Sequence, residues 1–345
     1  MSDGKLHAGV IGAAGMIGGE LLRLLALHPR VGKITAVSKS NAGRAAHEAH
    51  KALLHLPPIE FVDLAAEDLA QQADVVFCTM AHGDSQKIMP ALIASEVRCV
   101  IDLGADFRLR DAQAFAAYYG PHTQPALLSQ FVYGLPEVFA ARIRGARLVA
   151  NPGCFATAAQ LLLLPLAAAR LLPDTTAVFA VTGSSGAGVT QKPSTHHPFR
   201  ANNLFAYKML AHQHEAEIDQ TLSDVAAQAA RVRLLSHSGP FVRGIHATAY
   251  LRDAALAALD LPRMYRDFYR ASPFVLVLDR PPEIGEVAGT NFAHVHVVQR
   301  GDEVELLLTL DNLIKGGAGQ AIQNMNLAFG FPETAGLEYP GAFPC

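Results

Sequence analysis

A glycine-rich turn joins the first apolar run of the chain to its first helical segment. The stretch from Val10 to Gly18 places Gly12, Gly15 and Gly18 three residues apart, after the apolar run and at the start of the helix. Glycine allows a tight turn and a close approach of another group, and the first turn of a helix has unpaired N–H groups. The chain therefore begins with a strand, a tight turn and a helix whose N-terminus can receive an anion.

Apolar runs alternate with segments of helical periodicity through the first part of the chain. The predicted strands are Leu6 to Gly12, Lys33 to Ser38, Asp74 to Cys78 and Arg98 to Asp102, and the predicted helices include Met16 to His28 and Ser85 to Ser95. Such alternation is typical of a parallel sheet covered by helices. We therefore expect an α/β chain that starts with a Rossmann-type parallel-sheet nucleotide domain.

The pattern changes after Cys154, where strand-like segments, several of them alternating, become more frequent. They are Ala177 to Gly183, Arg231 to Leu235, His246 to Leu251, Phe274 to Leu278, Phe292 to Val298 and Glu303 to Leu310. These strands favour a mixed or antiparallel sheet with a few helices across it. The 345 residues suggest two domains. We predict a nucleotide domain over 1–152, an α+β domain with a mixed sheet over 153–314, and a segment, 315–345, that returns to the first domain.

The end of the second predicted strand indicates which dinucleotide the first domain takes. A carboxylate usually stands there to bind the ribose 2′-hydroxyl of NAD. This chain has Ser38, Lys39 and Arg44 in that region, which can hold a 2′-phosphate instead. We therefore expect NADP(H), with a solvated basic turn as the alternative. The expected cofactor-binding residues are Gly12, Ala14, Gly15, Met16, Ile17, Ser38, Lys39, Arg44 and, from a later glycine-rich loop, Gly186.

Cys154 is the candidate nucleophile. It ends the run Val149 to Cys154 and opens the apolar stretch Phe155 to Leu172, so its thiol should lie in the first turn of a helix. The positive end of that helix favours the thiolate, which is the form that attacks carbonyl carbon. The alternative is a small buried hydrophobic side chain.

His212 and His214 lie just ahead of a predicted helix, and one of them can donate a proton to a developing alkoxide. Glu215 and Glu217 follow them without a third imidazole at helical spacing. We therefore expect no metal site here.

Further polar residues are candidates for substrate binding. Arg108 follows a strand of the first sheet and can anchor a phosphate, with a surface ion pair to Asp106 as the alternative. Ser184 and Ser185 belong to a loop that either approaches a ligand or simply turns. The remaining candidates are Arg200, His212 and Gln213, whereas the roles of Lys192, His196, His197 and Cys345 stay open.

Composition excludes several classes of protein. The formal net charge of −3 gives no reason to expect nucleic acid or a membrane surface as partner. No apolar run has the length and character of a membrane span, and the N-terminus has no pattern of a targeting signal, so we expect a cytoplasmic location. Four widely spaced cysteines indicate neither a zinc site nor a disulfide scaffold. We expect a small-molecule substrate.

Several motifs together resemble those of the N-acetyl-γ-glutamyl-phosphate reductases, which are related to aspartate-semialdehyde dehydrogenase. The resemblance extends over nearly the whole chain. It is carried by Gly12 to Gly18, Asp102 to Leu109, Val132 to Glu137, Ala150 to Cys154, Ser185 to Gly188, Arg243 to Ile245 and Asp311 to Asn326.

The resemblance implies reduction of an acyl phosphate by NADPH. Its nucleophile falls on Cys154, which would form a thioester, and its acid–base histidine falls in His212 to His214, with His214 favoured. It also implies that Asn324 faces the nicotinamide and that the second domain forms a homodimer or homotetramer.

The chain departs from the family pattern at Gln213, where relatives commonly have Arg, and at Phe155 to Thr157. The segment from His196 to Arg200 also resembles the branch that reduces aminoadipyl phosphate on a carrier protein. The substrate is therefore expected to be N-acetyl-γ-glutamyl phosphate, with N-succinylglutamyl phosphate or carrier-bound aminoadipyl phosphate as alternatives. A non-enzymatic NADP-binding sensor is a more distant alternative.

Overall fold

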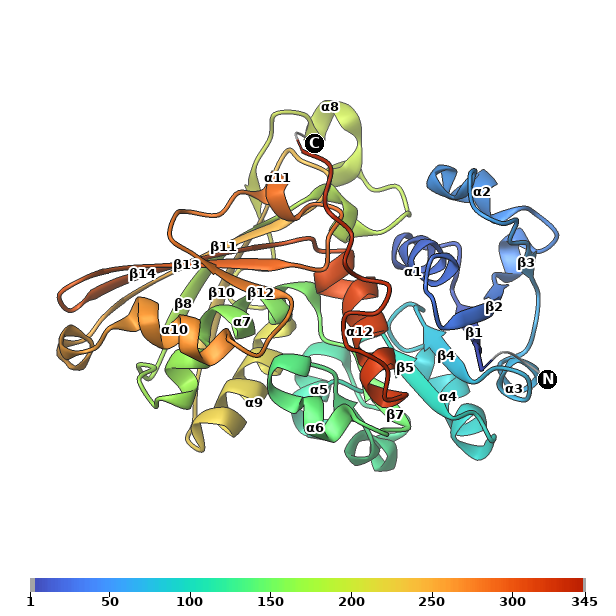
Figure 1. Ribbon diagram of the computed structural model, residues 1–345, viewed down its shortest axis with the longest axis horizontal. Coiled ribbons are helices and arrows are strands. Elements are labelled where there is room, and N and C mark those ends of the chain that lie inside the picture. Colours follow the sequence, from blue (N-terminus) through green and yellow to red (C-terminus); the bar gives the residue numbers. More distant parts are fainter. Residues whose placement is uncertain (1–3, 344–345) are drawn as a thin grey trace. The chain divides into compact units, whose positions relative to one another are not determined.

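Seven parallel strands form the sheet of the first unit (Figure 1). The structure is a computed structural model that describes residues 4–343. The strand order is β3-β2-β1-β4-β5-β7-β6. The strands are β1 (Leu6–Ile11), β2 (Val31–Val37), β3 (Phe61–Val62), β4 (Val75–Cys78), β5 (Cys99–Asp102), β6 (Val132–Tyr133) and β7 (Leu148–Ala150). The order reverses between β1 and β4, as in dinucleotide-binding folds, so the predicted Rossmann-type domain is confirmed.

The helices of this unit connect and cover its strands. They are α1 (Met16–Ala26), α2 (Ala46–Ala49), α3 (Ala66–Ala70), α4 (Ser85–Ala94), α5 (Ala112–Tyr119), α6 (Pro136–Ile143) and α12 (Gly319–Ala328). Every residue of β4, β5 and β7 is buried, because helices lie on both faces of a parallel sheet. The late helix α12 packs against α1, α6 and β5, so the chain returns to this unit.

The chain divides into two compact units at Pro152 and Gly153. The first unit also contains Gly317–Glu338, whereas the second contains Gly153–Gly316 and the chain from Tyr339 onward. Our prediction that all of 315–345 joins the first domain was therefore wrong at both ends. Lys315 lies over the ring of Phe274, and Gly341 packs against Ala288 and Thr290, all in the second unit. Cys345 lies outside the described residues.

The second unit has a mixed sheet of seven strands in the order β12-β13-β14-β11-β8-β10-β9. The strands are β8 (Thr176–Thr182), β9 (Phe205–Ala206), β10 (Val232–Ser238), β11 (Ile245–Arg252), β12 (Val275–Leu278), β13 (Ala293–Arg300) and β14 (Glu303–Leu310). The pairs β8–β10 and β12–β13 are parallel and the other pairs are antiparallel. The predicted mixed sheet is confirmed.

Three helices pack on this sheet: α7 (Cys154–Ala168), α9 (His214–Ala226) and α10 (Leu261–Tyr269). Two shorter helices are α8 (His197–Arg200) and α11 (Ile284–Val287). Pro165 lies inside α7 and has no N–H to donate to the carbonyl of Leu161. The hydroxyl of Tyr269 in α10 donates to that carbonyl instead, so the two helices are joined where α7 lacks its own hydrogen bond.

Candidate active site

Cys154 is the first residue of α7, as predicted. The helix follows Gly153, which occupies the N-cap position and has no side chain of its own to cap the first turn. Every residue from Phe155 to Ala167 is buried, which fixes the position of the helix. The Cys154 side chain is only partly buried and forms no disulfide. A thiol therefore stands at the positive end of a firmly packed helix, where a thiolate is favoured.

A buried carboxylate connects the start of α7 to the histidine pair. The backbone N–H of Gly153 donates to Oε2 of Glu217 at 3.0 Å, and Nε2 of His214 lies 3.9 Å from Oε1 of the same residue. His214 is the first residue of α9, and Glu217 lies one turn further on. The His214 ring also lies close against Gly153, because a Cβ at Gly153 would be 2.4 Å from Nε2. The structure thus brings His214 next to the residue that precedes Cys154.

His212 has a different environment from His214. It is almost fully buried, and its Nδ1 accepts a hydrogen bond from the backbone N–H of His214 at 3.2 Å. Burial, with smaller effects from His214 and Lys208, lowers the pKa of His212 to about 3. A ring that stays neutral at physiological pH is a poor proton donor, so His214 is the better suited of the two histidines, and its acid–base role stays a prediction.

Two further residues, Tyr207 and Gly316, lie close to Cys154. Burial raises the pKa of Tyr207, and the nearby Cys154 adds to that effect. A Cβ at Gly316 would be 2.7 Å from Cβ of Cys154, so Gly316 is needed for close packing of the backbone there. Gly316 belongs to the π-helical turn Ile314–Ala318, and its N–H donates to the carbonyl of Asp311 at 2.9 Å. Such turns often occur at functional sites.

The loop from Ser184 to Ala187 is tied to the residues that precede this π-helical turn. Ser185 donates to the carbonyl of Val242 at 2.6 Å and accepts from the amide of Asn312 at 3.0 Å, and it is buried. Asn312 also accepts from the N–H of Gly244 at 2.8 Å. The predicted phosphate-binding role therefore fits the partly exposed Ser184 better than Ser185, whose hydroxyl is engaged within the unit.

In the first unit, the glycine turn has the geometry of a phosphate site. Gly12 has a φ of +84°, and a Cβ there would be 2.7 Å from Oγ1 of Thr79. A Cβ at Gly18 would be 2.7 Å from the backbone of Ala13. Gly15 precedes α1 without a side-chain cap, and residues 14–17 are partly exposed. The first N–H groups of α1 are therefore suited to receive a pyrophosphate.

The residues that follow β2 are polar, and two of the predicted cofactor contacts among them are exposed. Ser38 is nearly buried, and its hydroxyl accepts from the amide of Asn41 at 3.1 Å. Arg44 is exposed and pairs with Glu48 at 3.0 Å. Lys39 is exposed as well. No carboxylate stands at the end of β2, so these residues fit a phosphorylated ribose.

Arg108 donates hydrogen bonds to backbone carbonyls of the first unit. It is nearly buried, its Nε donates to the carbonyl of Asn151 at 2.8 Å and its Nη2 to the carbonyl of Leu103 at 2.7 Å. These bonds join the ends of β5 and β7. A role of Arg108 in binding the substrate phosphate stays a prediction, but its guanidinium already stabilises the fold of the first unit.

Three other predicted site residues also have structural contacts. Asn324 is fully buried and donates to the carbonyl of Gly134 and to Asn151, both at 3.0 Å. The guanidinium of Arg200 is held by Ser238 and the carbonyl of Gly239. Gln213 accepts from Lys208. Gly186 is exposed in its loop, as a cofactor contact requires.

Residues 4–343 contain no group of three or more His, Cys, Asp or Glu side chains that could hold a metal ion. In the same range no helix combines the length and the apolar character needed to cross a membrane.

Sequence reasoning missed Glu217 and Tyr207 as parts of this site. The spacing of His214 and Glu217, three residues apart, places them on one face of a helix and was the signal that could have identified the pair. Tyr207 had no such signal, because its proximity to Cys154 arises from the packing of a loop.

Comparisons with known proteins match both units. The family model described as semialdehyde dehydrogenase, NAD binding domain, matches residues 7–146, and the one described as semialdehyde dehydrogenase, dimerisation domain, matches residues 154–312.

Curated relatives align over nearly the whole chain. N-acetyl-gamma-glutamyl-phosphate reductase of Desulforudis audaxviator is 40% identical over 98% of this chain and 100% of its own length. The protein of that name from Nitrosospira multiformis is 41% identical over 98% and 100%. A putative [LysW]-L-2-aminoadipate/[LysW]-L-glutamate phosphate reductase of Pyrobaculum aerophilum is 40% identical over 96% and 97%.

Solved structures of similar fold include aspartate semialdehyde dehydrogenase II of Vibrio cholerae, with a TM-score of 0.73 and 17% identity over 94% of this chain and 98% of that one. Another is aspartate semialdehyde dehydrogenase with NADP from Candida albicans, with a TM-score of 0.67 and 16% identity over 94% and 99%. At this identity the similarity shows the fold alone.

Proposed function

Because the chain belongs to the semialdehyde dehydrogenase family, and within it to the N-acetyl-gamma-glutamyl-phosphate reductases, we propose that it reduces N-acetyl-γ-glutamyl phosphate with NADPH to N-acetylglutamate 5-semialdehyde. The observation that carries this proposal is the arrangement of Cys154 at the start of α7 with His214 and Glu217 beside Gly153. A nucleophile next to an oriented base is the arrangement that covalent catalysis needs.

The reaction begins with attack of the Cys154 sulfur on the acyl carbon. The bond from that carbon to the phosphate oxygen breaks, inorganic phosphate leaves with the electron pair, and a thioester remains. The first N–H groups of α7 lie at the positive end of the helix and are suited to stabilise the developing oxyanion. His214 protonates that oxygen after reduction and takes the proton back as the carbon–sulfur bond breaks, which releases the aldehyde and restores the thiolate.

The residues of the first unit fit a bound dinucleotide phosphate. The glycine turn and the first turn of α1 would hold the pyrophosphate, and Ser38, Lys39 and Arg44 would hold a 2′-phosphate. The nicotinamide supplies the hydride when it is bound. NADP(H) is favoured over NAD(H) because no carboxylate stands at the end of β2.

We infer further that the second unit associates with a second copy through the open face of its sheet. The large apolar side chains Phe179, Leu235, Tyr250, Leu276 and Val298 alternate with buried residues on five strands and are 38% to 57% exposed. Exposed apolar patches of this kind mark interfaces. The match to a dimerisation domain supports the same inference.

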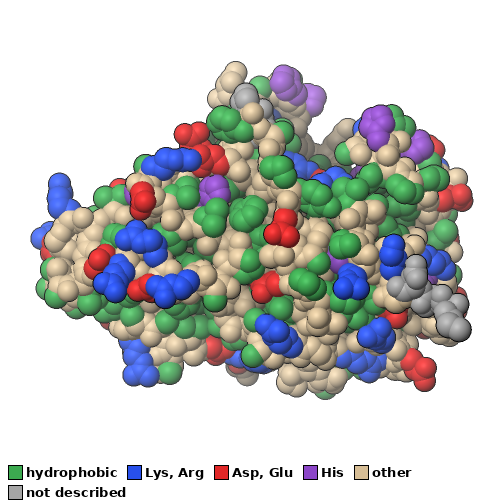
Figure 2. Space-filling model, viewed as in Figure 1, with side chains coloured by type: hydrophobic (Ala, Val, Ile, Leu, Met, Phe, Trp, Pro, Cys, Tyr) green, Lys and Arg blue, Asp and Glu red, His purple; other side chains and the backbone are tan. Residues whose placement is uncertain are grey.

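A carrier-bound acyl phosphate is the second candidate substrate. The chain has no Asp or Glu from Thr175 to His214, whereas Lys192, Arg200 and Lys208 lie in this segment. His196 and His197 are exposed, and histidine side chains project from the surface over α8 in Figure 2. Elsewhere on the face that Figure 2 shows, basic and acidic side chains are interspersed. An acid-free basic segment suits an acidic carrier, and one curated relative is named for such a substrate.

The test is phosphate-dependent reduction of NADP by the purified protein. N-acetylglutamate semialdehyde is compared with the N-succinyl compound and with carrier-bound aminoadipate semialdehyde, each also with NAD. A strong preference for the acetylated aldehyde and for NADP supports the proposal. Preference for the carrier-bound aldehyde moves the substrate to the second candidate, and no reaction with any aldehyde contradicts the proposed activity.

A further inference from the structure

The connection that follows β4, Thr79 to Asp84, lies directly against the glycine turn. The hydroxyl of Thr79 donates to the carbonyls of Ile11 and Gly12 at 2.9 and 3.0 Å. Strand β4 pairs with β1, at the place where the strand order of the sheet reverses. Open parallel sheets bind ligands outside the carboxyl ends of their strands at this place. The connection therefore borders the predicted cofactor site within the first unit.

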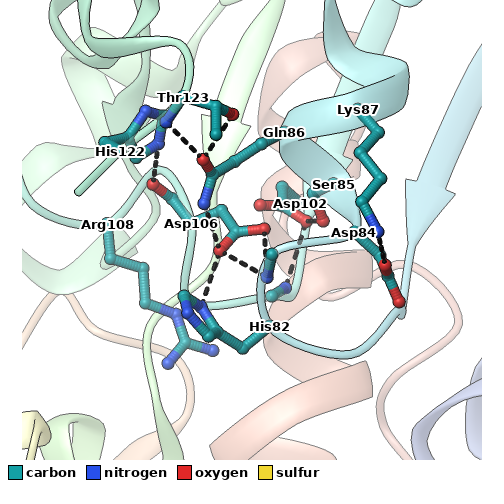
Figure 3. Close-up of polar contacts among 12 residues, drawn as sticks. His82, Asp84, Ser85, Gln86, Lys87, Asp102, Asp106, Arg108, His122 and Thr123 are labelled. Carbon is teal, nitrogen blue, oxygen red and sulfur yellow. Dashed lines mark hydrogen bonds and ion pairs between the residues drawn. The ribbon is translucent and has the colours of Figure 1, made fainter. Parts of the chain in front are cut away.

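A fully buried carboxylate, Asp106, holds this connection in shape (Figure 3). Its two oxygens accept from the N–H of Gly83 at 2.9 and 3.0 Å, and Oδ1 also accepts from the amide of Gln86 at 3.2 Å. Gln86 in turn accepts from the N–H and the hydroxyl of Thr123 at 2.8 and 2.7 Å. The backbone carbonyl of Asp106 is bonded to Nε2 of His122 at 2.9 Å. Because Asp106 is hydrogen-bonded to several segments, the position of its carboxylate is fixed.

The carboxylate of Asp106 also orients the side chain of His82. Its Nδ1 lies 2.8 Å from Oδ1 of Asp106, and its ring packs on that of Tyr119 with 4.4 Å between the ring centres. The side chain is nevertheless 38% exposed. The structure records no hydrogen bond to Nε2 from any residue between 4 and 343. A neutral imidazole that donates its Nδ1–H to a carboxylate has an acceptor at Nε2, so His82 offers a fixed acceptor to solvent or to a ligand.

The topology indicates which part of a ligand meets this acceptor. The half of such a sheet that starts with β1 and β2 binds one mononucleotide of the dinucleotide, and the half that starts with β4 binds the other. Ser38 and Arg44, which fit the 2′-phosphate of the adenosine half, follow β2. His82 follows β4, so it belongs to the nicotinamide half. An acceptor at Nε2 suits a hydroxyl donor, and the ribose supplies one.

We propose that His82 is a cofactor-binding residue that accepts a hydrogen bond from the ribose of the nicotinamide half, and that Asp106 is its positioning residue. This assignment rests on the proposed function, because it requires that the first unit binds NADP(H). It differs from the glycine turn, proposed for the pyrophosphate, and from the residues after β2, proposed for the 2′-phosphate, in that it acts on the nicotinamide half.

The test uses His82→Asn, because the Asn amide can keep the bond to Asp106 while the atom at the Nε2 position is lost. We expect the dissociation constant for NADPH, measured by fluorescence titration, to rise about three- to tenfold, as loss of one hydrogen bond predicts. The dissociation constant for adenosine 2′,5′-bisphosphate, which lacks the nicotinamide half, should not change. The melting temperature should also stay the same.

Equal NADPH binding by His82→Asn and the unchanged protein would overturn the assignment, and so would equal weakening of both ligands. Failure of the unchanged protein to bind either ligand would instead overturn the proposed function and the assignment with it. Lys87→Ala is the matched control, because it removes an exposed side chain of the neighbouring helix whose ion pair is with Asp84. It should bind both ligands normally.

Asp106→Asn tests the positioning role. It should weaken NADPH binding without affecting the bisphosphate, and the double variant with His82→Asn should bind no more weakly than the weaker single variant, because both act through one contact. Independent, additive losses would contradict a positioning role. Thermal unfolding of each variant separates this effect from general loss of structure.

Discussion

Helices α1 and α7 begin in the same way but are equipped for different chemistry. Gly15 precedes α1 and Gly153 precedes α7, so the N-cap residue of both helices has no side chain. At α1 the first turn carries Met16 and Ile17 and is partly exposed, so it can only bind. At α7 the first residue is Cys154, with His214 against the preceding glycine. The positive end of a helix thus supports binding or catalysis according to the side chains placed at it.

The largest expected effect distinguishes the catalytic role proposed for the start of α7 from the binding role proposed for the start of α1. Replacing Cys154 with Ala should lower kcat by about 10⁴-fold or more, because no other group can form the thioester. NADPH binding, measured by fluorescence, should stay within a few fold of normal. Retained turnover would contradict the covalent route, and lost NADPH binding would show that the start of α7 also serves the cofactor.

The second expected effect distinguishes the two histidines near α7. His214→Asn should lower kcat by about 10²- to 10⁴-fold, as loss of an acid–base residue does. His212→Asn can still accept the bond from the N–H of His214, so its kcat should stay within a few fold. Steady-state kinetics of both variants checks this, and the reverse order of effects would assign the acid–base role to His212.

The glycines at the two helix starts provide the next comparison. Gly153→Ala places a Cβ 2.4 Å from Nε2 of His214, without a backbone penalty since the φ of Gly153 is −72°. It should lower kcat by about 10²-fold through displacement of that ring and leave NADPH binding intact. Gly12→Ala has a φ of +84° and a contact with Thr79, so it should weaken NADPH binding and lower the melting temperature. Steady-state kinetics and NADPH titration of both variants should show a loss of kcat for Gly153→Ala and a loss of NADPH binding for Gly12→Ala. If both variants lost the same property, the start of α1 and the start of α7 would not differ in function.

A smaller effect concerns only the cofactor side. Arg44→Ala should reduce the preference for NADPH over NADH by about tenfold, because a charge-assisted bond to the 2′-phosphate is lost. The exposed pair with Glu48 contributes little to stability, so the melting temperature should hardly change. Ratios of kcat/KM with the two cofactors measure the preference, and an unchanged ratio would leave Ser38 and Lys39 as the selective residues.

The smallest effect is a pH dependence of stability. Burial lowers the pKa of His212 from an ordinary 6.5 to about 3 in the folded chain. Between these values the unfolded chain binds more protons, so this contribution is full above pH 6.5 and declines as the pH falls toward 3. The melting temperature of His212→Asn should therefore fall by a few degrees less than that of the unchanged protein between pH 7 and pH 5.

Scanning calorimetry measures this difference, and parallel curves would contradict it. Asp102 and Asp219 act in the opposite direction, because burial raises the pKa of each to about 6, so their contribution is lost as the pH rises through that value. Both residues are present in the two proteins compared, and their effect cancels.

Much of the fold could be predicted because its signals are local. The strand–helix alternation before Cys154 and the alternating strands after it arise from periodicity within each segment. The short strands β3, β6 and β9 were missed, because two residues carry no period. The C-terminal segment was assigned to one domain, whereas the contacts of Lys315 and Gly341 lie in the second unit.

Only the parts of the site that have a local sequence signal could be predicted. Cys154 and the glycine turn were recognisable from their neighbours in the chain. The engagement of Arg108 by the carbonyl of Asn151, and of Arg200 by Ser238 and Gly239, depends on segments far apart in sequence. Neither set of partners has a local signature.

The sequence by itself determined where α1 and α7 begin and which side chains stand at their first turns, since glycines and apolar periods act over a few residues. Only the tertiary structure decided which partners those side chains have. It placed Glu217 against the N–H of Gly153, buried His212 so that its ring stays neutral, and set Asp106 behind His82. These outcomes depend on the burial and hydrogen bonding that follow from packing of distant segments, and the energy of a polar group changes most when it leaves water.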